Sequence, residues 1–179
     1  TKCGIASYSK RIIDQFPEEI LIFAPRTEDN HANDNIISSW ELSPGDKKLD
    51  NLLNEILANN ITTIVIQFNY GFYSFSRLDQ LIKDLHKHDI NILIQLHSTR
   101  DPSHDDTKKL YLLKDSLGLC QRILVHTIDD VNRLKLIGII DNVMLFPHGI
   151  NNYEPKKKYL NSIKNLVPFK RVFNIATFG

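Results

Sequence analysis

Apolar residues follow two different spacings along this chain. Near its start, Ile5, Tyr8, Ile12 and Phe16 recur at the three- and four-residue intervals of one helix face. Further on, short continuous apolar runs such as residues 62–68 (TTIVIQF) are typical of strands buried in a parallel sheet. Segments of the two kinds follow one another, so we predict a regular alternation of strands and helices.

The strands and helices that this pattern predicts account for most of the chain. The predicted strands are residues 20–24, 36–42, 62–68, 90–96, 122–125 and 143–146. The predicted helices follow Gly4, open at Ser43 with a capping box to Asp46, include residues 78–85 and 110–117, and open again at Thr127. Strict alternation favours an α/β fold with a Rossmann-like, doubly wound parallel sheet.

The composition of the chain narrows the classes of protein to which it can belong. The chain has 179 residues and is 42% hydrophobic, which is enough for one well-packed core. A net charge of +1 argues against nucleic-acid binding driven by bulk charge. Two cysteines are too few for a disulfide framework and favour a reducing, cytoplasmic compartment. No apolar run approaches the roughly 20 residues of a membrane helix.

Polar residues stand where several predicted strands end. They are Gln67, Asn69, His97, His126 and His148. Parallel strands bring their carboxyl ends to one edge, where ligands of such sheets bind, so we expect several of these side chains on one rim. Gly4 precedes a helix start, whose free N–H groups and dipole favour anions, and we expect it on the same rim if a strand precedes it.

Several short motifs together resemble a known family. They are residues 3–9 (CGIASYS), 67–73 (QFNYGFY), 96–98 (LHS), 125–127 (VHT), 146–150 (FPHGI) and 174–179 (NIATFG). Their order and spacing resemble the amino-terminal domain of a family 4 glycosyltransferase, which has the two-domain GT-B fold. Asn69 departs from the pattern, because an acidic residue is common there. A first strand before Thr1 and the second domain are not in the sequence.

The resemblance implies a domain division and a reaction. Residues 1–168 would form the acceptor-side domain, and residues 169–179 the linker and first strand of the nucleotide-sugar-binding domain. The implied enzyme transfers a sugar, usually with retention, from a nucleoside diphosphate sugar to a saccharide or lipid-linked acceptor. It needs no cofactor and no metal. Lipid-linked acceptors would add peripheral contact with a membrane.

We assign roles to individual residues on this basis. The backbone of Gly4 and Ile5 would bind the diphosphate of the donor, because fixed N–H dipoles stabilise developing charge. His97 is the catalytic candidate. Its carbonyl would face the sugar ring and its side chain would hold donor or acceptor, without acting as a general base. Acceptor binding is assigned to the remaining candidates, Gln67, Asn69, Tyr70, His126 and His148.

Other interpretations of the same residues stay open. Gly4 also fits a plain turn, and each histidine fits a structural residue that bonds to backbone at a strand end. Three histidines at strand ends also suggest a metal site, although none of the pairs has the short spacing typical of metal ligands. At the level of the chain, the alternatives are a non-catalytic Rossmann-like module that binds a nucleotide or a protein, and a nucleotide-sugar epimerase.

Overall fold

The computed structural model describes residues 4–18, 20–26, 35–41 and 49–149. The chain divides into two units, Thr1–Pro147 and His148–Gly179. Of the second unit, only His148 and Gly149 lie among the described residues. The predicted boundary at residue 168 and the predicted strand in residues 174–179 therefore lie outside them.

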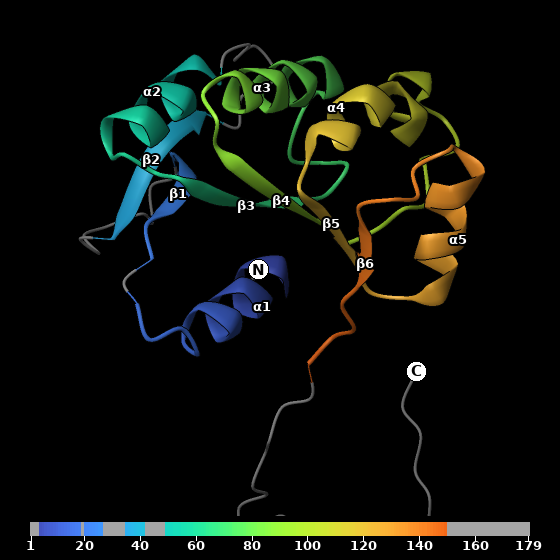
Figure 1. Ribbon diagram of the computed structural model, residues 1–179, viewed down its shortest axis with the longest axis horizontal. Helices are drawn as coiled ribbons and strands as arrows, with labels where there is room; N and C mark the ends of the chain where they lie inside the picture. The colour runs from blue at the N-terminus through green and yellow to red at the C-terminus, as the bar shows by residue number, and fades with distance from the viewer. Residues whose placement is uncertain (1–3, 19, 27–34, 42–48, 150–179) are drawn as a thin grey trace, which may run out of the picture. The chain divides into compact units, whose positions relative to one another are not determined.

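Helices and strands alternate along the first unit as the apolar pattern predicts (Figure 1). The helices are α1 (Gly4–Ile13), α2 (Asp50–Ala58), α3 (Phe75–Lys87), α4 (Lys114–Leu119) and α5 (Ile128–Leu136), with 3-10 turns at Asp106–Lys108 and Leu110–Leu113. The strands are β1 (Ile22–Arg26), β2 (Ile36–Glu41), β3 (Thr63–Phe68), β4 (Asn91–Leu96), β5 (Arg122–Val125) and β6 (Val143–Leu145). The element types predicted for this part of the chain are confirmed.

Several strand boundaries differ from the prediction by one residue, and three elements differ by more. β1 begins two residues later than residue 20, at Ile22, and continues through Pro25, where its register with β2 shifts because proline lacks the N–H that a ladder needs. α2 begins at Asp50 with Leu49 at its N-cap, and the predicted capping box at Ser43 lies outside the described residues. The helix predicted over residues 110–117 is a 3-10 turn that leads into the short α4.

The described strands form two parallel sheets rather than the single doubly wound sheet that we predicted. β1 pairs with β2, and the second sheet has the order β3-β4-β5-β6, with every pair parallel. No ladder joins β1 to β3 in the described part of the chain. Because the larger sheet runs in sequence order, right-handed crossovers place its connecting helices on one face. The structure is therefore α/β with parallel sheets.

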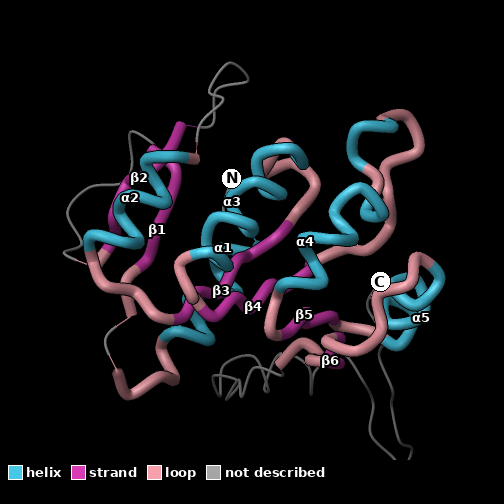
Figure 2. The backbone as a smooth tube through the Cα atoms, turned by 45° about the horizontal axis from the view of Figure 1, so that its top comes forward, coloured by secondary structure: helices cyan, strands magenta, loops and turns pink. Residues whose placement is uncertain are grey.

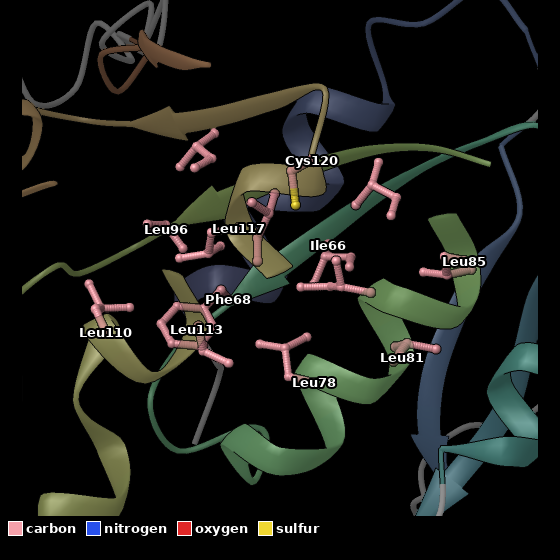
Figure 3. Packing of buried hydrophobic residues seen from close by; sticks show 14 of the residues in the cluster. Ile66, Phe68, Leu78, Leu81, Leu85, Leu96, Leu110, Leu113, Leu117 and Cys120 are labelled. Carbon is pink, nitrogen blue, oxygen red and sulfur yellow. The ribbon is translucent and has the colours of Figure 1, made fainter. Parts of the chain in front are cut away.

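The core lies between the four-stranded sheet and the helices that connect its strands (Figure 3). Alternate residues of the strands, including Ile66, Phe68 and Leu96, point toward Leu78, Leu81 and Leu85 of α3 and toward Leu113 and Leu117. Leu78 and Leu85 are fully buried, which confirms the stripe predicted for this helix. This packed face holds the carboxyl ends of the strands in place.

The opposite face of the sheet has a different character. α1 lies on this side, whereas α3 and α4 lie on the other (Figure 1), and Figure 2 shows the same helices and strands from a view turned by 45°. No residue of α1 is fully buried, and the side chain of Val65 remains 51% exposed. The continuous apolar run of β3 predicts that the strand is buried on both faces. This prediction is wrong for the face that carries Val65. In the part of the chain that the structure describes, no helix is both long and apolar enough to cross a membrane.

Candidate functional site

Two histidines occupy the carboxyl edge of the four-stranded sheet. His97 directly follows β4, and His126 directly follows β5. Because these strands are parallel neighbours, their ends lie side by side, and the two imidazole rings have centroids 5.2 Å apart. His97 is half-buried and His126 is 9% exposed. The prediction that strand-end histidines meet on one rim is confirmed for this pair.

A continuous series of hydrogen bonds runs through both histidines. Nε2 of His97 lies 2.7 Å from Oε1 of Gln67, which is on β3. On its other side, Nδ1 of His97 lies 3.3 Å from Nε2 of His126. Nδ1 of His126 in turn lies 3.0 Å from the backbone carbonyl oxygen of Phe146, just after β6. The ends of four parallel strands thus contribute to one polar network.

The network continues away from the histidines to α1. Nε2 of Gln67 donates to Oε1 of Gln95 over 3.3 Å, and Nε2 of Gln95 donates to the hydroxyl oxygen of Tyr8 over 2.7 Å. The Tyr8 ring also stands edge-on to both histidine rings, with centroid distances of 5.4 Å to His97 and 5.7 Å to His126. We call these five side chains, Tyr8, Gln95, Gln67, His97 and His126, the rim chain.

The rim chain connects the start of α1 to the predicted site. Tyr8 is four residues after Gly4, which is about one helical turn. Since Tyr8 contacts His97 and His126, α1 packs beside the carboxyl ends of β4 and β5, and its first turn, with Gly4 and Ile5, is about one turn away from that contact. The structure therefore brings Gln67, His97 and His126 together and packs α1, the helix that includes Gly4 and Ile5, against them through Tyr8.

Sequence reasoning missed two members of the rim chain. On the sequence alone, Tyr8 is assigned no role in the site beyond the apolar helix face and the CGIASYS motif, and Gln95 is interpreted only as part of an apolar strand. A signal for Gln95 exists, because Gln67 and Gln95 each stand one residue before the end of their strands and pair in register. Gln95 is 1% exposed, and a buried glutamine in an apolar strand needs hydrogen-bond partners.

Gly4 differs from its predicted conformation. It is the first residue of α1 rather than part of a turn before it, and its backbone lies outside the left-handed region. Apart from its chain neighbours and the backbone of its own helix, a Cβ added at Gly4 would meet no atom of the described residues within 4 Å. Neither backbone strain nor packing inside the described protein therefore requires glycine here, and the space beside Gly4 is open.

Asn69 and Tyr70 form structural contacts in the turn after β3. Oδ1 of Asn69 accepts a hydrogen bond from the backbone N–H of Gly71 over 3.1 Å. The Tyr70 ring stacks on Phe75, and its hydroxyl donates to Asp101 over 2.8 Å. Burial, together with this hydrogen bond, raises the pKa of Tyr70 above its ordinary value. Acceptor binding by these two residues stays a prediction.

A second polar cluster anchors α5 beside the same edge. Thr127 caps α5 in the predicted capping box, in which its hydroxyl accepts from the backbone N–H of Asp130 and its own N–H donates to the Asp130 carboxylate. Thr99 and Arg133 also donate to that carboxylate. Burial would raise the pKa of Asp130, but these hydrogen bonds outweigh it and hold the pKa at about 2.

The other candidate features are not members of the rim chain. His148 is exposed and belongs to the second unit. A hollow of about 630 Å³ is lined by residues of the α3 start and of the Asp106–Lys108 turn, including Ser74, Asp79 and Lys108, and by no member of the rim chain. Within the described ranges, no three His, Cys, Asp or Glu side chains are grouped to hold a metal ion.

The chain was compared with protein-family models, with curated proteins and with solved structures, and none of these comparisons gives a match. Functional assignment therefore depends on the residues themselves and on their geometry. The features that bear on it are the rim chain, the open space beside Gly4 and the start of α1.

Proposed function

We propose that this chain is the acceptor-side half of a glycosyltransferase of the GT-B type. The enzyme would move a sugar from a nucleoside diphosphate sugar to a saccharide or lipid-linked acceptor. The observation that carries the proposal is the contact between Tyr8 on α1 and His97 after β4, with ring centroids 5.4 Å apart. Residues far apart in sequence, which the motifs single out separately, thereby share one edge of the sheet.

The two elements that meet in this contact, α1 and the end of β4, suit the two charges that develop in the reaction. Negative charge develops on the leaving diphosphate, and the N–H groups at the start of α1 are fixed dipoles that stabilise an anion without reorganising. Positive charge develops on the sugar ring, where the backbone carbonyl at His97 would provide electrostatic stabilisation. The open space beside Gly4 would let a phosphate approach the backbone closely.

The divided sheet is compatible with the same proposal. A strand inserted between β1 and β3 would join the two sheets in the order β2-β1-x-β3-β4-β5-β6, where x is the inserted strand. That is the order of a doubly wound sheet, in which the first strand leads into the helix with the phosphate-binding turn. In this proposal, the inserted strand would precede Gly4 and lead into α1.

The proposal is tested by measuring donor binding and transfer in the complete gene product. We expect at least one sugar in a panel of UDP-, GDP-, ADP- and dTDP-sugars to raise the melting temperature and to yield a glycoside with a suitable acceptor. Gly4→Val should abolish transfer by crowding the diphosphate. Gly118→Val is the matched control, because it also adds a side chain to open space in a helix.

Each result bears on a different part of the proposal. If no nucleoside diphosphate sugar binds, the glycosyltransferase proposal is wrong. Donor binding without any product supports the non-catalytic Rossmann-like module instead, and an epimerised donor without a glycoside supports the epimerase. If Gly4→Val retains full transfer while its melting temperature equals that of Gly118→Val, the start of α1 does not bind the diphosphate.

A further inference from the structure

With the side-chain amides of Gln67 and Gln95 oriented as in this structure, the order of donors and acceptors in the rim chain places one proton on each histidine. Because Nε2 of Gln95 donates to Tyr8 and Nε2 of Gln67 donates to Gln95, Gln67 presents its carbonyl oxygen Oε1 to His97. A carbonyl oxygen can only accept, so Nε2 of His97 must carry a proton. At the other end, the Phe146 carbonyl accepts from Nδ1 of His126, which must carry a proton too.

The two remaining ring nitrogens face each other. They are Nδ1 of His97 and Nε2 of His126, which lie 3.3 Å apart. With only the two outer protons present, each ring is neutral and both inner nitrogens hold lone pairs. Two lone pairs at this separation repel, whereas one additional proton between them makes a charge-assisted hydrogen bond.

We propose that His97 and His126 share one extra proton and form a singly charged imidazole–imidazolium pair at the rim. The four ring nitrogens then hold three protons, two directed at the outer acceptors and one between the rings. The proton belongs to the pair and not to either ring. In the proposed glycosyltransferase, this positive charge would attract the phosphate groups of the donor, and that role rests on the proposed function.

The following partners of the pair, all from the described residues, are compatible with one positive charge. Tyr8 from α1, Gln67 from β3 and Gln95 from β4 are neutral polar side chains of the rim chain. The Tyr8 ring stands edge-on to both imidazoles. Two charged side chains of α5 are bonded close by along the chain: Asp130 accepts from Thr127, which follows His126, and Arg133 donates to Thr99, two residues after His97. Asp130 and Arg133 form an ion pair with each other at 2.8 Å.

The neutral pair requires a different amide arrangement. If Gln67 turns its NH₂ group toward His97, Nε2 of His97 can accept and Nδ1 of His97 can donate to His126. Gln95 must then turn as well, because its Oε1 would otherwise face the oxygen of Gln67. Loss of one proton from the histidines would thus rotate two amides and make the Tyr8 hydroxyl a donor instead of an acceptor.

The proposal is tested by nitrogen NMR of the histidine rings, in the ¹⁵N-labelled chain without any ligand, over a pH range of about 5 to 8. We expect protonated-type signals from Nε2 of His97 and Nδ1 of His126, and an averaged signal from the two inner nitrogens. Gln67→Glu presents only acceptor oxygens and adds a negative charge. It should preserve the three-proton state to a pH about one unit higher.

A second variant and a matched control make the test specific. Gln67→Leu removes the outer acceptor and should move loss of the shared proton to lower pH. Gln121→Glu makes the same charge change at an exposed glutamine just before β5 and should leave the histidine signals unchanged.

Two outcomes would overturn the proposal. One is that unmodified His97 and His126 each show one protonated and one bare nitrogen throughout the pH range. The other is that Gln67→Glu and Gln121→Glu shift the signals equally. Because no sugar or nucleotide is used, neither outcome depends on the glycosyltransferase proposal.

Discussion

The hydroxyl of Tyr8 accepts a hydrogen bond of 2.7 Å from the side-chain amide of Gln95, 87 residues further along the chain. This bond connects α1 to the interior of β4, where Gln95 is 1% exposed. A buried amide needs such partners, because it has lost its hydrogen bonds to water. If no protein group replaces them, the folded state is destabilised. The same residue brings α1 to the histidines at the sheet edge, because its ring contacts both imidazoles.

Removing only the Tyr8 hydroxyl tests the energetic weight of this contact. Tyr8→Phe retains the ring against His97 and His126 but leaves the Gln95 N–H groups without this acceptor. We expect the free energy of unfolding to fall by about 1–2 kcal/mol. The measurement is urea denaturation at neutral pH. Tyr111→Phe is the matched control, because Tyr111 is 57% exposed, and its effect should stay below about 0.5 kcal/mol.

The Asp130 carboxylate gives a pH-dependent prediction. Its pKa is about 2 in the folded protein, against an ordinary value of 3.8, so the ionised form is favoured by folding. The stabilisation is therefore complete above about pH 4 and is lost as the pH falls toward 2. A shift of this size corresponds to roughly 2 kcal/mol.

Comparing unfolding of the unmodified protein with that of Asp130→Asn between about pH 2 and 7 measures this stabilisation. The unmodified protein should be more stable at neutral pH, and the difference should shrink below about pH 4. Asp129→Asn alters an exposed carboxylate in the same helical turn and serves as the control. A difference that stays constant down to pH 2 would contradict the assigned hydrogen bonds.

Two glycines should respond oppositely to the same substitution. Gly138, which follows α5, has a φ of +79°, a conformation that side chains rarely adopt. Gly138→Ala should therefore destabilise the protein by about 1–2 kcal/mol. Gly118 lies within α4 with open space beside it, so Gly118→Ala should be neutral or stabilising by up to about 1 kcal/mol. Thermal or urea unfolding of both variants decides the matter, and equal effects would contradict the backbone assignment at Gly138.

Cys120 should be unreactive in the folded protein. Burial raises the pKa of its thiol to about 12, so very little thiolate is present at pH 8. In a Cys3→Ser background, we expect a thiol reagent to modify Cys120 far more slowly in buffer than in denaturant. Rapid labelling of the folded protein would mean that the end of α4 opens readily.

Much of the fold follows from local patterns. The apolar stripe of α3 and the capping box of α5 are both present as predicted, because each depends on residues within one or two helical turns. The division into two sheets was not predicted, because apolar runs identify strands but do not specify which strands pair.

The candidate site, like the fold, could be predicted from the sequence only in part. The sequence by itself places His97 and His126 at strand ends, since a parallel sheet carries the ends of neighbouring strands to one edge. Gln95 has a sequence signal in its position one residue before a strand end, but only the tertiary structure pairs it with Gln67. Tyr8 has no such signal, because a contact across 87 residues leaves no mark in its local spacing. The physical reason is that periodicity records which face of an element is buried, whereas hydrogen-bond partners are chosen when separate elements pack together.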